Sequence, residues 1–488
     1  MENFLVDGKW RRGGGQAFES INPANGNLNA IVAQGNAQDV DEAVRSSRDA
    51  MAKPMWRDMA AHKRARLLQK MADLIEKEAE DLAQIQTKDN GKTIAESRFQ
   101  SQMAADMFRY YAAVCETTES NLIPSRGNYF CFSSFEAVGV VAAITPWNSP
   151  ITLEAQKLAP ALAAGNAIVM KSSEVTPLIG LQYGRLALEA GFPPGILNVV
   201  TGFGANVGQP LVAHPDIGMV TFTGGTHSGR EIAKVAAQRL IPCMLELGGK
   251  SPNIVFDDAN IDDAIAGLIY GIFSNAGQSC IAGSRVLIQA GIYDKLLPRF
   301  VEATKLLKLG SPMDSLTAVA PVSSFRHRDN IEKFIATGIQ EGARLLCGGS
   351  RPIGGIFDTG AYVAPTILEL ENRLATVAQE EVFGPVACVM KFQDENDLYD
   401  LANNTVYGLA CGIWTTDYRR ALRASSRIKA GTVWINTYKI AEVNVPFGGV
   451  KQSGLGRECG IEGMREYMVQ KSTYLNTSTE AVKWPPRG

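Results

Sequence analysis

The residue best suited to nucleophilic chemistry is Cys280, which ends the segment FSNAGQSC at residues 273–280. Gly277 permits a sharp backbone bend, and the polar neighbours leave backbone amides free to face a ligand. A thiol at the end of such a loop can be an exposed nucleophile with a low pKa. The alternative is a small buried thiol beside a turn, the commoner situation for a single cysteine.

A nucleophile needs a base, and no histidine lies near Cys280 in the sequence. Glu246 stands between two leucines in LELGGK, residues 245–250. Burial there would raise its pKa toward neutrality, so that it could accept a proton from the thiol or from water. A salt-bridged glutamate at the end of a strand is the alternative for this fragment.

Asn148 lies in TPWNSP, residues 145–150, directly after an expected strand. Ligands collect at the carboxyl ends of strands in an open parallel sheet. The Asn148 amide could donate to an oxyanion, and such a donor can be worth about 2.7–4 kcal/mol. A turn asparagine that stabilises its own loop is an equally good reading of this fragment.

Two further segments could hold phosphate or ribose groups. FTGGTHSG, residues 222–229, opens an expected helix whose N-terminal amides would face a pyrophosphate. It lacks the G-x-G-x-x-G spacing and is a weak signal alone. Lys171 and Glu174 follow another expected strand, where they could bind ribose hydroxyls or phosphate, or simply form a surface ion pair.

The elements that would position these residues alternate between strands and helices. Residues 37–53 and 58–85 have the spacing of amphipathic helices. Downstream we expect strands at 137–145, 167–171, 196–201 and 219–223, with helices at 151–164, 176–191, 206–213 and 226–238. Repeated β-α-β units predict an α/β protein with a doubly wound, Rossmann-like dinucleotide-binding domain.

The remaining segments divide into a second domain and an arm. Strands near 252–256, 284–289, 386–392, 410–415 and 431–436 indicate an α/β catalytic domain over 248–447. Residues 118–137 and 466–488 are strand-like but too polar for a core of their own. We expect them to form a small β arm for oligomerisation, leaving 1–117 and 138–247 to the dinucleotide-binding domain.

Composition excludes several other classes. The 488 residues carry a net charge of −2, which gives no reason to expect a nucleic-acid partner. Apolar runs are only strand-sized and no signal peptide is evident, so we expect a cytoplasmic protein without a membrane segment. Eight scattered cysteines and four histidines predict neither a disulfide framework nor a metal site.

Together the motifs PWN, KSSE, FTGGT, LELGGK, FSNAGQSC, EEVFGPV and PFGGVKQSGLGRE resemble the aldehyde dehydrogenase superfamily, over about residues 20–475. The resemblance implies that Cys280 attacks an aldehyde to give a thiohemiacetal, while Asn148 and the Cys280 backbone amide hold the oxyanion. Hydride transfer to a nicotinamide would leave a thioester, which water activated by Glu246 hydrolyses. Lys157 and Glu458 would relay the proton.

The resemblance also implies a cofactor site. Lys171 and Glu174 match the adenosine-ribose positions, and a carboxylate there favours NAD over NADP. Gly225 replaces a serine that is common in the family. The other positions implied to bind the cofactor are Trp147, Gly224, Thr226, Gly229, Leu247, Glu381 and Phe383.

The family's aldehyde tunnel would be lined by Ser149, Thr152, Leu153, Gln156, Ser279, Ile281, Ala441 and Phe447. Small and polar side chains at these positions suggest a polar, semialdehyde or ring-derived substrate, although no arginine is found there for a second carboxylate. The alternatives are a CoA-acylating member, against which Glu246 argues, a thiol esterase, and a non-enzymatic protein. We expect a homodimer or homotetramer.

Overall fold

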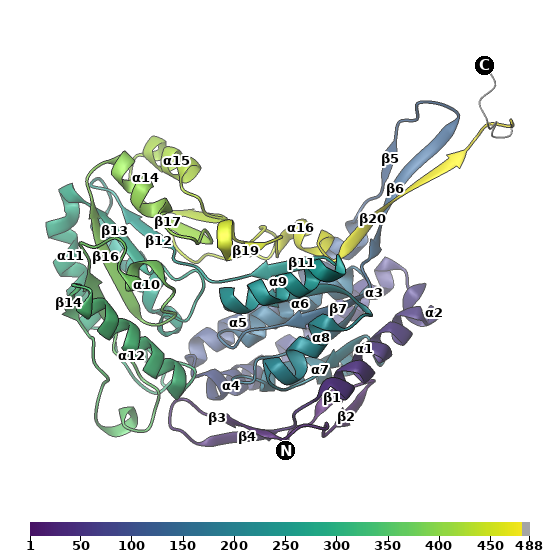
Figure 1. Cartoon of the computed structure of the whole chain (residues 1–488), viewed down its shortest axis with the longest axis horizontal. Helices are drawn as coiled ribbons and strands as arrows, with labels where there is room; N and C mark the ends of the chain where they lie inside the picture. Colours follow the sequence, from purple (N-terminus) through teal and green to yellow (C-terminus); the bar gives the residue numbers. More distant parts are fainter. Residues whose placement is uncertain (481–488) are drawn as a thin grey trace.

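The computed structural model describes residues 1–480, which form two α/β lobes and a projecting β arm (Figure 1). The first lobe is built on an eight-stranded sheet. In spatial order its strands are β19 (Gly454–Leu455), β11 (Cys243–Glu246), β10 (Ile217–Thr223), β7 (Val140–Ile144), β8 (Ala167–Lys171), β9 (Leu197–Val199), β1 (Phe4–Val6) and β2 (Lys9–Arg11). Parallel pairing joins the five strands from β11 to β9.

The order of these parallel strands creates a topological switch point. The chain runs from β7 to β8 and β9, then returns past β7 to build β10 and β11 on its other side. Adjacent connections therefore leave β7 and β10 in opposite directions, which opens a crevice at their carboxyl ends. The predicted Rossmann-like α/β class is confirmed.

Helices cover both faces of this sheet. The segments 37–53 and 151–164 are confirmed as α1 (Ala37–Ala52) and α6 (Pro150–Ala163), and α1 begins with a capping box between Asn36 and Asp39. The other helices of this lobe are α2 (Pro54–Arg57), α3 (Ala61–Lys77), α4 (Ala79–Asn90), α5 (Ile94–Thr117), α7 (Leu178–Ala190), α8 (Gln209–Ala213), α9 (Thr226–Arg239) and α16 (Gly460–Arg465), with a π-helical turn η1 (Gly204–Gly208).

Three features of this lobe differ from the sequence predictions. The single helix expected over 58–85 is two helices, α3 and α4, because Glu78 leaves the helical conformation with φ −103° and ψ 18°. The long helix α5 was not predicted. Nor were β1, β2 and the hairpin of β3 (Phe18–Ile21) with β4 (Leu28–Val32).

The second lobe holds a seven-stranded sheet with its own hydrophobic core. Its strands are β14 (Arg344–Cys347), β15 (Thr366–Glu369), β16 (Val386–Phe392), β13 (Arg285–Gln289), β12 (Pro252–Val255), β17 (Ala410–Trp414) and β18 (Thr432–Ile435). Five of the seven match predicted strands; β14 and β15 were missed. Its helices are α10 (Ile261–Phe273), α11 (Ala290–Lys305), α12 (Phe325–Gln340), α13 (Thr376–Gln379), α14 (Glu395–Asn403) and α15 (Tyr418–Arg427), with short 3-10 turns η2 (Ser274–Gly277), η3 (Gly355–Phe357) and η4 (Lys451–Ser453).

The arm is an antiparallel sheet of β5 (Asn121–Ile123), β6 (Tyr129–Ala137) and β20 (Met468–Asn476). It projects away from both lobes (Figure 1). Its large exposed apolar side chains include Leu122, Tyr129, Phe130, Tyr474 and Leu475. Residues 481–488 of the expected arm lie outside the described residues. Within 1–480, no helix has the length and apolar character needed to cross a bilayer.

Candidate active site

Three sequence-distant loops meet at Cys280: η2 and the residues after it, the Gly-Gly turn after β11, and the loop before β16. A Cβ atom on Gly249 would lie 2.2 Å from the Cys280 carbonyl oxygen. Gly277 has φ +73°, and a Cβ atom there would lie 2.0 Å from the carbonyl oxygen of Gly384. Both contacts exclude any larger residue, so these glycines allow the three motifs to pack together.

The loop that leads to Cys280 is strained. Asn275 and Ala276 have φ values of 52° and 50°, in the left-handed region that non-glycine residues rarely adopt. The Asn275 backbone amide donates to Oε1 of Glu96 at 2.7 Å, and its side-chain amide donates to the Gln278 carbonyl at 2.9 Å. Such conformations persist where the surroundings hold them, most often at functional sites.

Asn148 is fixed against the same loop. Its buried side-chain amide donates to the Gln278 carbonyl at 3.0 Å. Asn90 and Asn275 each donate a side-chain amide to the Asn148 carbonyl, at 3.3 and 3.2 Å. An asparagine amide has two N–H groups, so the second hydrogen of Asn148 remains able to reach a ligand beside residues 274–280, here called the nucleophile loop.

The environment of Cys280 differs from the expected low-pKa thiol. The residue is partly exposed, but burial of the sulfur raises its pKa to about 12, and the nearby carboxylates Glu381 and Glu246 raise it further in that direction. The expectation of a low pKa is therefore wrong for the protein without ligands. The thiol needs a base or a nearby positive charge before it can attack.

Glu246 ends β11 and is 2 % exposed. Within residues 1–480 neither carboxylate oxygen accepts a hydrogen bond of good geometry, although the nearby Gly449 backbone amide acts to lower the pKa of Glu246 slightly. Burial raises the pKa of Glu246 well above its usual value, and Glu458 raises it too, against the smaller opposing effect of Lys157. The predicted rise in pKa through burial is confirmed. A carboxyl group that is buried, unpaired and hard to ionise has the properties of a general base.

Lys157 and Glu458 form a buried ion pair behind Glu246. The Lys157 ammonium lies 2.7 Å from Oε1 of Glu458, and both side chains are at most 1 % exposed. Lys157 also donates to the hydroxyl of Thr221 at 2.9 Å. The Gln156 amide, expected to line the tunnel, donates to the other Glu458 oxygen. The pair thus connects α6 to the segment 454–460.

The carboxyl ends of the parallel strands carry the residues expected to hold a dinucleotide. After β8, Lys171 and Glu174 form an ion pair at 2.9 Å. After β10, Gly224 and Gly225 precede α9, and a Cβ atom on Gly225 would meet no atom within 4 Å. Thr226 begins α9, and its hydroxyl accepts from the Gly248 amide at 3.3 Å. This open helix N-terminus at the switch point suits a pyrophosphate.

The remaining expected cofactor residues lie on the two sides of the Gly-Gly turn. Gly229, in the first turn of α9, packs against Leu247. Oε1 of Glu381 accepts from the Gly249 amide at 2.9 Å, and burial raises the pKa of Glu381 to about 7. Residues of the Gly-Gly turn, the nucleophile loop and the β16 loop also line a cavity of about 10 Å³: Gly249, Gly277, Ser279, Ala282, Ser284, Glu381, Val382, Phe383, Gly384 and Val386.

A cluster of three rings borders this cavity. Trp147 lies edge-on to His327 and to Phe383, with ring centroids 5.0 and 5.1 Å apart. Nε2 of His327 lies 2.7 Å from the Phe383 carbonyl oxygen, and burial lowers the pKa of His327. Phe383 has φ +56°, a third strained residue at the site. His327 was missed from the sequence because it stands alone on α12, far from every motif.

The expected tunnel residues occupy several positions. Ser149, Thr152 and Leu153 lie at the start of α6, while Ser279 and Ile281 flank Cys280. The backbone of Phe447 pairs with that of Glu458, and Ala441 is exposed. Sequence reasoning also missed Lys439, whose ammonium donates to the Ser274 hydroxyl at 2.8 Å; only its place two residues before Ala441 could have signalled it.

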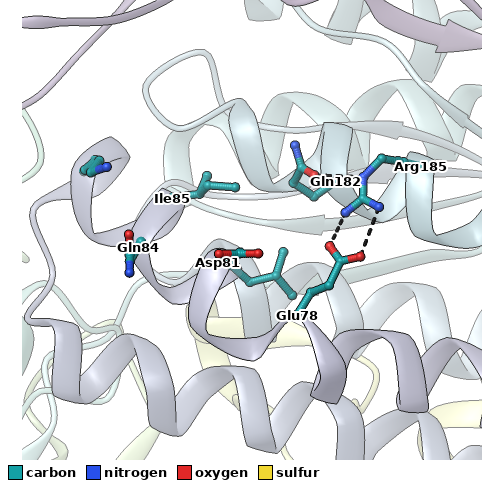
Figure 2. A pocket seen from close by; sticks show the side chains of 8 residues that line it. Glu78, Asp81, Gln84, Ile85, Gln182 and Arg185 are labelled. Atoms are coloured by element: carbon teal, nitrogen blue, oxygen red, sulfur yellow. Dashed lines mark hydrogen bonds and ion pairs between the residues drawn. The ribbon is translucent and has the colours of Figure 1, made fainter.

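A larger surface hollow, of about 340 Å³, lies elsewhere, between α4 and α7 (Figure 2). Arg185 crosses it to bind the carboxylate of Glu78 through both guanidinium nitrogens. Its lining is Glu78, Asp81, Leu82, Gln84, Ile85, Lys88, Gln182 and Arg185. None of these residues belongs to the motifs above, so the hollow is separate from the candidate active site.

A doubly wound sheet with a topological switch point, and a cysteine loop packed beside a buried glutamate near it, are features of a dinucleotide-binding enzyme. The chain matches the aldehyde dehydrogenase family over residues 10–473 and belongs to that family. It is 39% identical over 485 residues to a betaine aldehyde dehydrogenase of Bacillus subtilis, covering 99% of both chains. It is 40% identical over 489 residues to (Z)-2-((N-methylformamido)methylene)-5-hydroxybutyrolactone dehydrogenase of Acinetobacter baylyi, again covering 99% of both.

Solved structures agree with this assignment. Betaine aldehyde dehydrogenase from Staphylococcus aureus, in complex with NAD⁺, has a TM-score of 0.98 at 37% identity, covering 100% of this chain and 97% of that one. A putative aldehyde dehydrogenase from Burkholderia cenocepacia has a TM-score of 0.97 at 40% identity, covering 100% and 99%. The chain is an aldehyde dehydrogenase, as the ordered motifs predicted.

Proposed function

We propose that this enzyme oxidises an aldehyde to the carboxylic acid with NAD as hydride acceptor, through a covalent intermediate on Cys280. The observation that carries the proposal is the convergence of three features: the Cys280 loop, the Asn148 amide fixed against it, and the unpaired buried carboxyl of Glu246. Each sits on a different segment, and the close packing at Gly249 and Gly277 brings those segments together.

In the first half-reaction the Cys280 thiol transfers its proton to water, and its sulfur attacks the carbonyl carbon. The carbonyl oxygen becomes an oxyanion, which the free N–H of Asn148 and the Cys280 backbone amide stabilise as donors already in place. NAD, when bound, accepts the hydride that leaves the tetrahedral carbon. The carbon–sulfur bond remains, and the product on Cys280 is a thioester.

In the second half-reaction Glu246 takes a proton from water as the water oxygen attacks the thioester carbon. The carbon–sulfur bond then breaks, which releases the carboxylic acid and restores Cys280. The raised pKa makes the ionised Glu246 a stronger base than an exposed carboxylate, which suits this role. The Lys157–Glu458 pair lies behind Glu246 and carries the proton onward.

The residues at the strand ends would hold NAD. Gly224, Gly225 and the first turn of α9 face the pyrophosphate, and the space beside Gly225 fits that group. Lys171 and Glu174 bind the adenosine ribose, where the Glu174 carboxylate disfavours a 2′-phosphate. Glu381 and Phe383 hold the nicotinamide half beside Cys280. Residues 1–117 and 138–247, which form most of the first lobe, would thus be the NAD-binding domain and 248–447 the catalytic domain.

The enzyme would assemble through its arm into a homodimer or homotetramer. Exposed apolar side chains on β5, β6 and β20 support this, because an uncovered apolar sheet tends to pair with another chain. The cytoplasm would be its compartment. Eight cysteines without a disulfide among residues 1–480 are typical of a reducing environment.

The experiment that tests this mechanism is a single-turnover burst of NADH at 340 nm in the parent, Glu246→Gln and Cys280→Ala. Glu246→Gln should keep the burst and lose steady-state turnover, because hydride transfer precedes the step that needs the base. Cys280→Ala should show neither. Loss of the burst in Glu246→Gln would place the base in the first half-reaction. Turnover that requires CoA would replace hydrolysis by acyl transfer.

A further inference from the structure

The loop that leads to Cys280 is contacted by a lysine that none of the motifs contains. Lys439 follows β18, has φ +57°, and donates its ammonium to the Ser274 hydroxyl at 2.8 Å. Its neighbour Tyr438 donates its hydroxyl to the Ile281 carbonyl at 3.1 Å. The segment 438–439 therefore contacts the chain on both sides of Cys280, and the Lys439 charge acts to lower the pKa of the Cys280 thiol.

A second lysine adds to the positive charge. Lys92, at the start of the segment before α5, is buried, and its charge and that of Lys439 repel each other. Burial lowers the pKa of each ammonium to about 8, so both remain mostly protonated at pH 7. Within residues 1–480, no carboxylate oxygen lies within 4.0 Å of either ammonium nitrogen.

Glu96 is the acidic residue that acts to raise the pKa of both Lys92 and Lys439. Its carboxylate oxygens, however, accept hydrogen bonds from other groups. Oε1 accepts from the Asn275 backbone amide and Oε2 from the Thr93 hydroxyl, both at 2.7 Å. Glu96 thus holds the strained nucleophile loop in place. The two ammonium groups of Lys92 and Lys439 and the single carboxylate of Glu96 therefore leave a net positive charge beside the site.

The other groups around Lys439 suit a polar substrate. The Ser274 hydroxyl is its partner, and the Ser149 hydroxyl accepts from the Gln100 amide at 3.1 Å on the Asn148 side of the loop. The Lys439 ammonium also lies 5.9 Å from the centre of the exposed Tyr270 ring. A quaternary ammonium group, such as betaine aldehyde carries, would be repelled here, whereas a carboxylate would gain a charge-assisted hydrogen bond.

We propose that Lys439 binds an anionic group at the far end of the substrate, so that the enzyme prefers short aldehydes bearing a carboxylate to neutral or cationic aldehydes of similar length. This inference rests on the proposed aldehyde oxidation at Cys280. Lys439 would form an ammonium–carboxylate contact while the aldehyde carbon lies at Cys280. Lys92 would favour the same charge from a greater distance.

The test compares kcat/KM for succinic semialdehyde, butanal and betaine aldehyde in the parent, Lys439→Met, Lys439→Arg and Lys305→Met. Lys305 is an exposed lysine on α11 that binds Glu302, so its variant removes the same charge at a remote position. We expect Lys439→Met to lower the semialdehyde-to-butanal ratio by about ten- to a hundredfold, mainly through KM. Loss of the Lys439 charge near the Cys280 thiol should affect all three aldehydes alike, so the ratio between substrates reports the anion contact, and betaine aldehyde should gain relative to butanal.

Lys439→Arg should retain most of the preference and Lys305→Met all of it. A parent enzyme that turns over butanal or betaine aldehyde better than the semialdehyde overturns the inference without any variant, even if Lys439→Met does not fold. An unchanged ratio in a folded Lys439→Met overturns it too. Failure of the parent with every aldehyde would instead overturn the proposed function, so the two failures are distinguishable.

Discussion

The packing of the Gly-Gly turn against the nucleophile loop predicts a large effect for the smallest possible substitution, Gly249→Ala. Gly249 lacks a positive φ, so alanine fits its backbone conformation and the effect isolates one contact. The new Cβ atom would lie 2.2 Å from the Cys280 carbonyl oxygen, and a separation of 3.0 Å requires the two segments to move apart by at least 0.8 Å.

Such a shift moves two functional groups at once. The displaced oxygen belongs to Cys280 itself, and the Gly249 amide holds Oε1 of Glu381 at 2.9 Å. Misplacing reacting groups by about 1 Å can lower the rate about a hundredfold. We therefore expect kcat/KM for the best aldehyde to fall by about two orders of magnitude, with a slower reaction of Cys280 with iodoacetamide.

The assay is NADH formation by Gly249→Ala beside Gly208→Ala, whose Cβ atom would meet nothing within 4 Å. The control should match the parent, and thermal melting should show that both variants fold. If folded Gly249→Ala retained kcat/KM within about threefold of the parent, the close contact would not position Cys280, and the geometric argument for the site would fail.

Two further predictions concern buried charges on α6. Burial raises the pKa of Glu154 to about 8, so between pH 4.5 and 8 the folded state keeps a proton that the unfolded state releases. The free energy of unfolding should therefore fall by up to about 5 kcal/mol as the pH rises from 4.5 to 8. Glu154→Gln should remove that fall, and equal pH slopes in urea unfolding of variant and parent would contradict it. Lys157→Met leaves the Glu458 carboxylate buried beside only Gln156, which should cost about 3–5 kcal/mol of stability. Adding Glu458→Gln should recover most of this loss, and a loss below about 1 kcal/mol in the single variant would argue against the buried pair.

Much of the central sheet could be predicted because its strands are buried on both faces. The predicted strands 167–171 and 386–392 coincide with β8 and β16, since buried parallel strands are continuous apolar runs bounded by turn residues. The first-lobe edge strands are different. β1 has only three residues, and its pairing of Leu5 with Val199 crosses nearly the whole lobe in sequence. A strand defined by such a distant partner has no local pattern to recognise.

Helix α5 escaped prediction for a related reason. It packs against α3, α4 and α6, so several of its faces are buried and small residues such as Ala104, Ala105 and Ser101 occupy the contacts. When apolar residues are spread over several faces of a helix, the periodicity of hydrophobicity in its sequence is weak. The break between α3 and α4 was hidden as well, because Glu78 suits a helix, and its partner Arg185 comes from α7.

In the candidate site, too, features set by local sequence could be predicted, whereas features set by contacts between distant segments could not. The proposed nucleophile, oxyanion donor and base stand in local motifs whose residue types indicate their chemistry, so Cys280, Asn148 and Glu246 could be selected as candidates from sequence. The electrostatics could not. The high pKa of Cys280 arises from burial and from Glu381 and Glu246, which folding brings in from other segments. The proposed preference for an anionic substrate rests in the same way on Lys439, which no motif includes.

Local sequence preference and observed conformation also disagree in the loops around Cys280. Ala276 and Phe383 adopt a left-handed conformation that their residue types disfavour, and Asn275, a type that tolerates it better, adopts the same one. Contacts from distant segments hold them there: Glu96 binds the Asn275 amide, and His327 lies against the Phe383 carbonyl. The surrounding fold must offset this strain, of order 1–3 kcal/mol at each residue. Because residues such as Asp7, Leu240 and Lys451 also have positive φ, the conformation is consistent with the loops selected by the motifs but does not identify them independently.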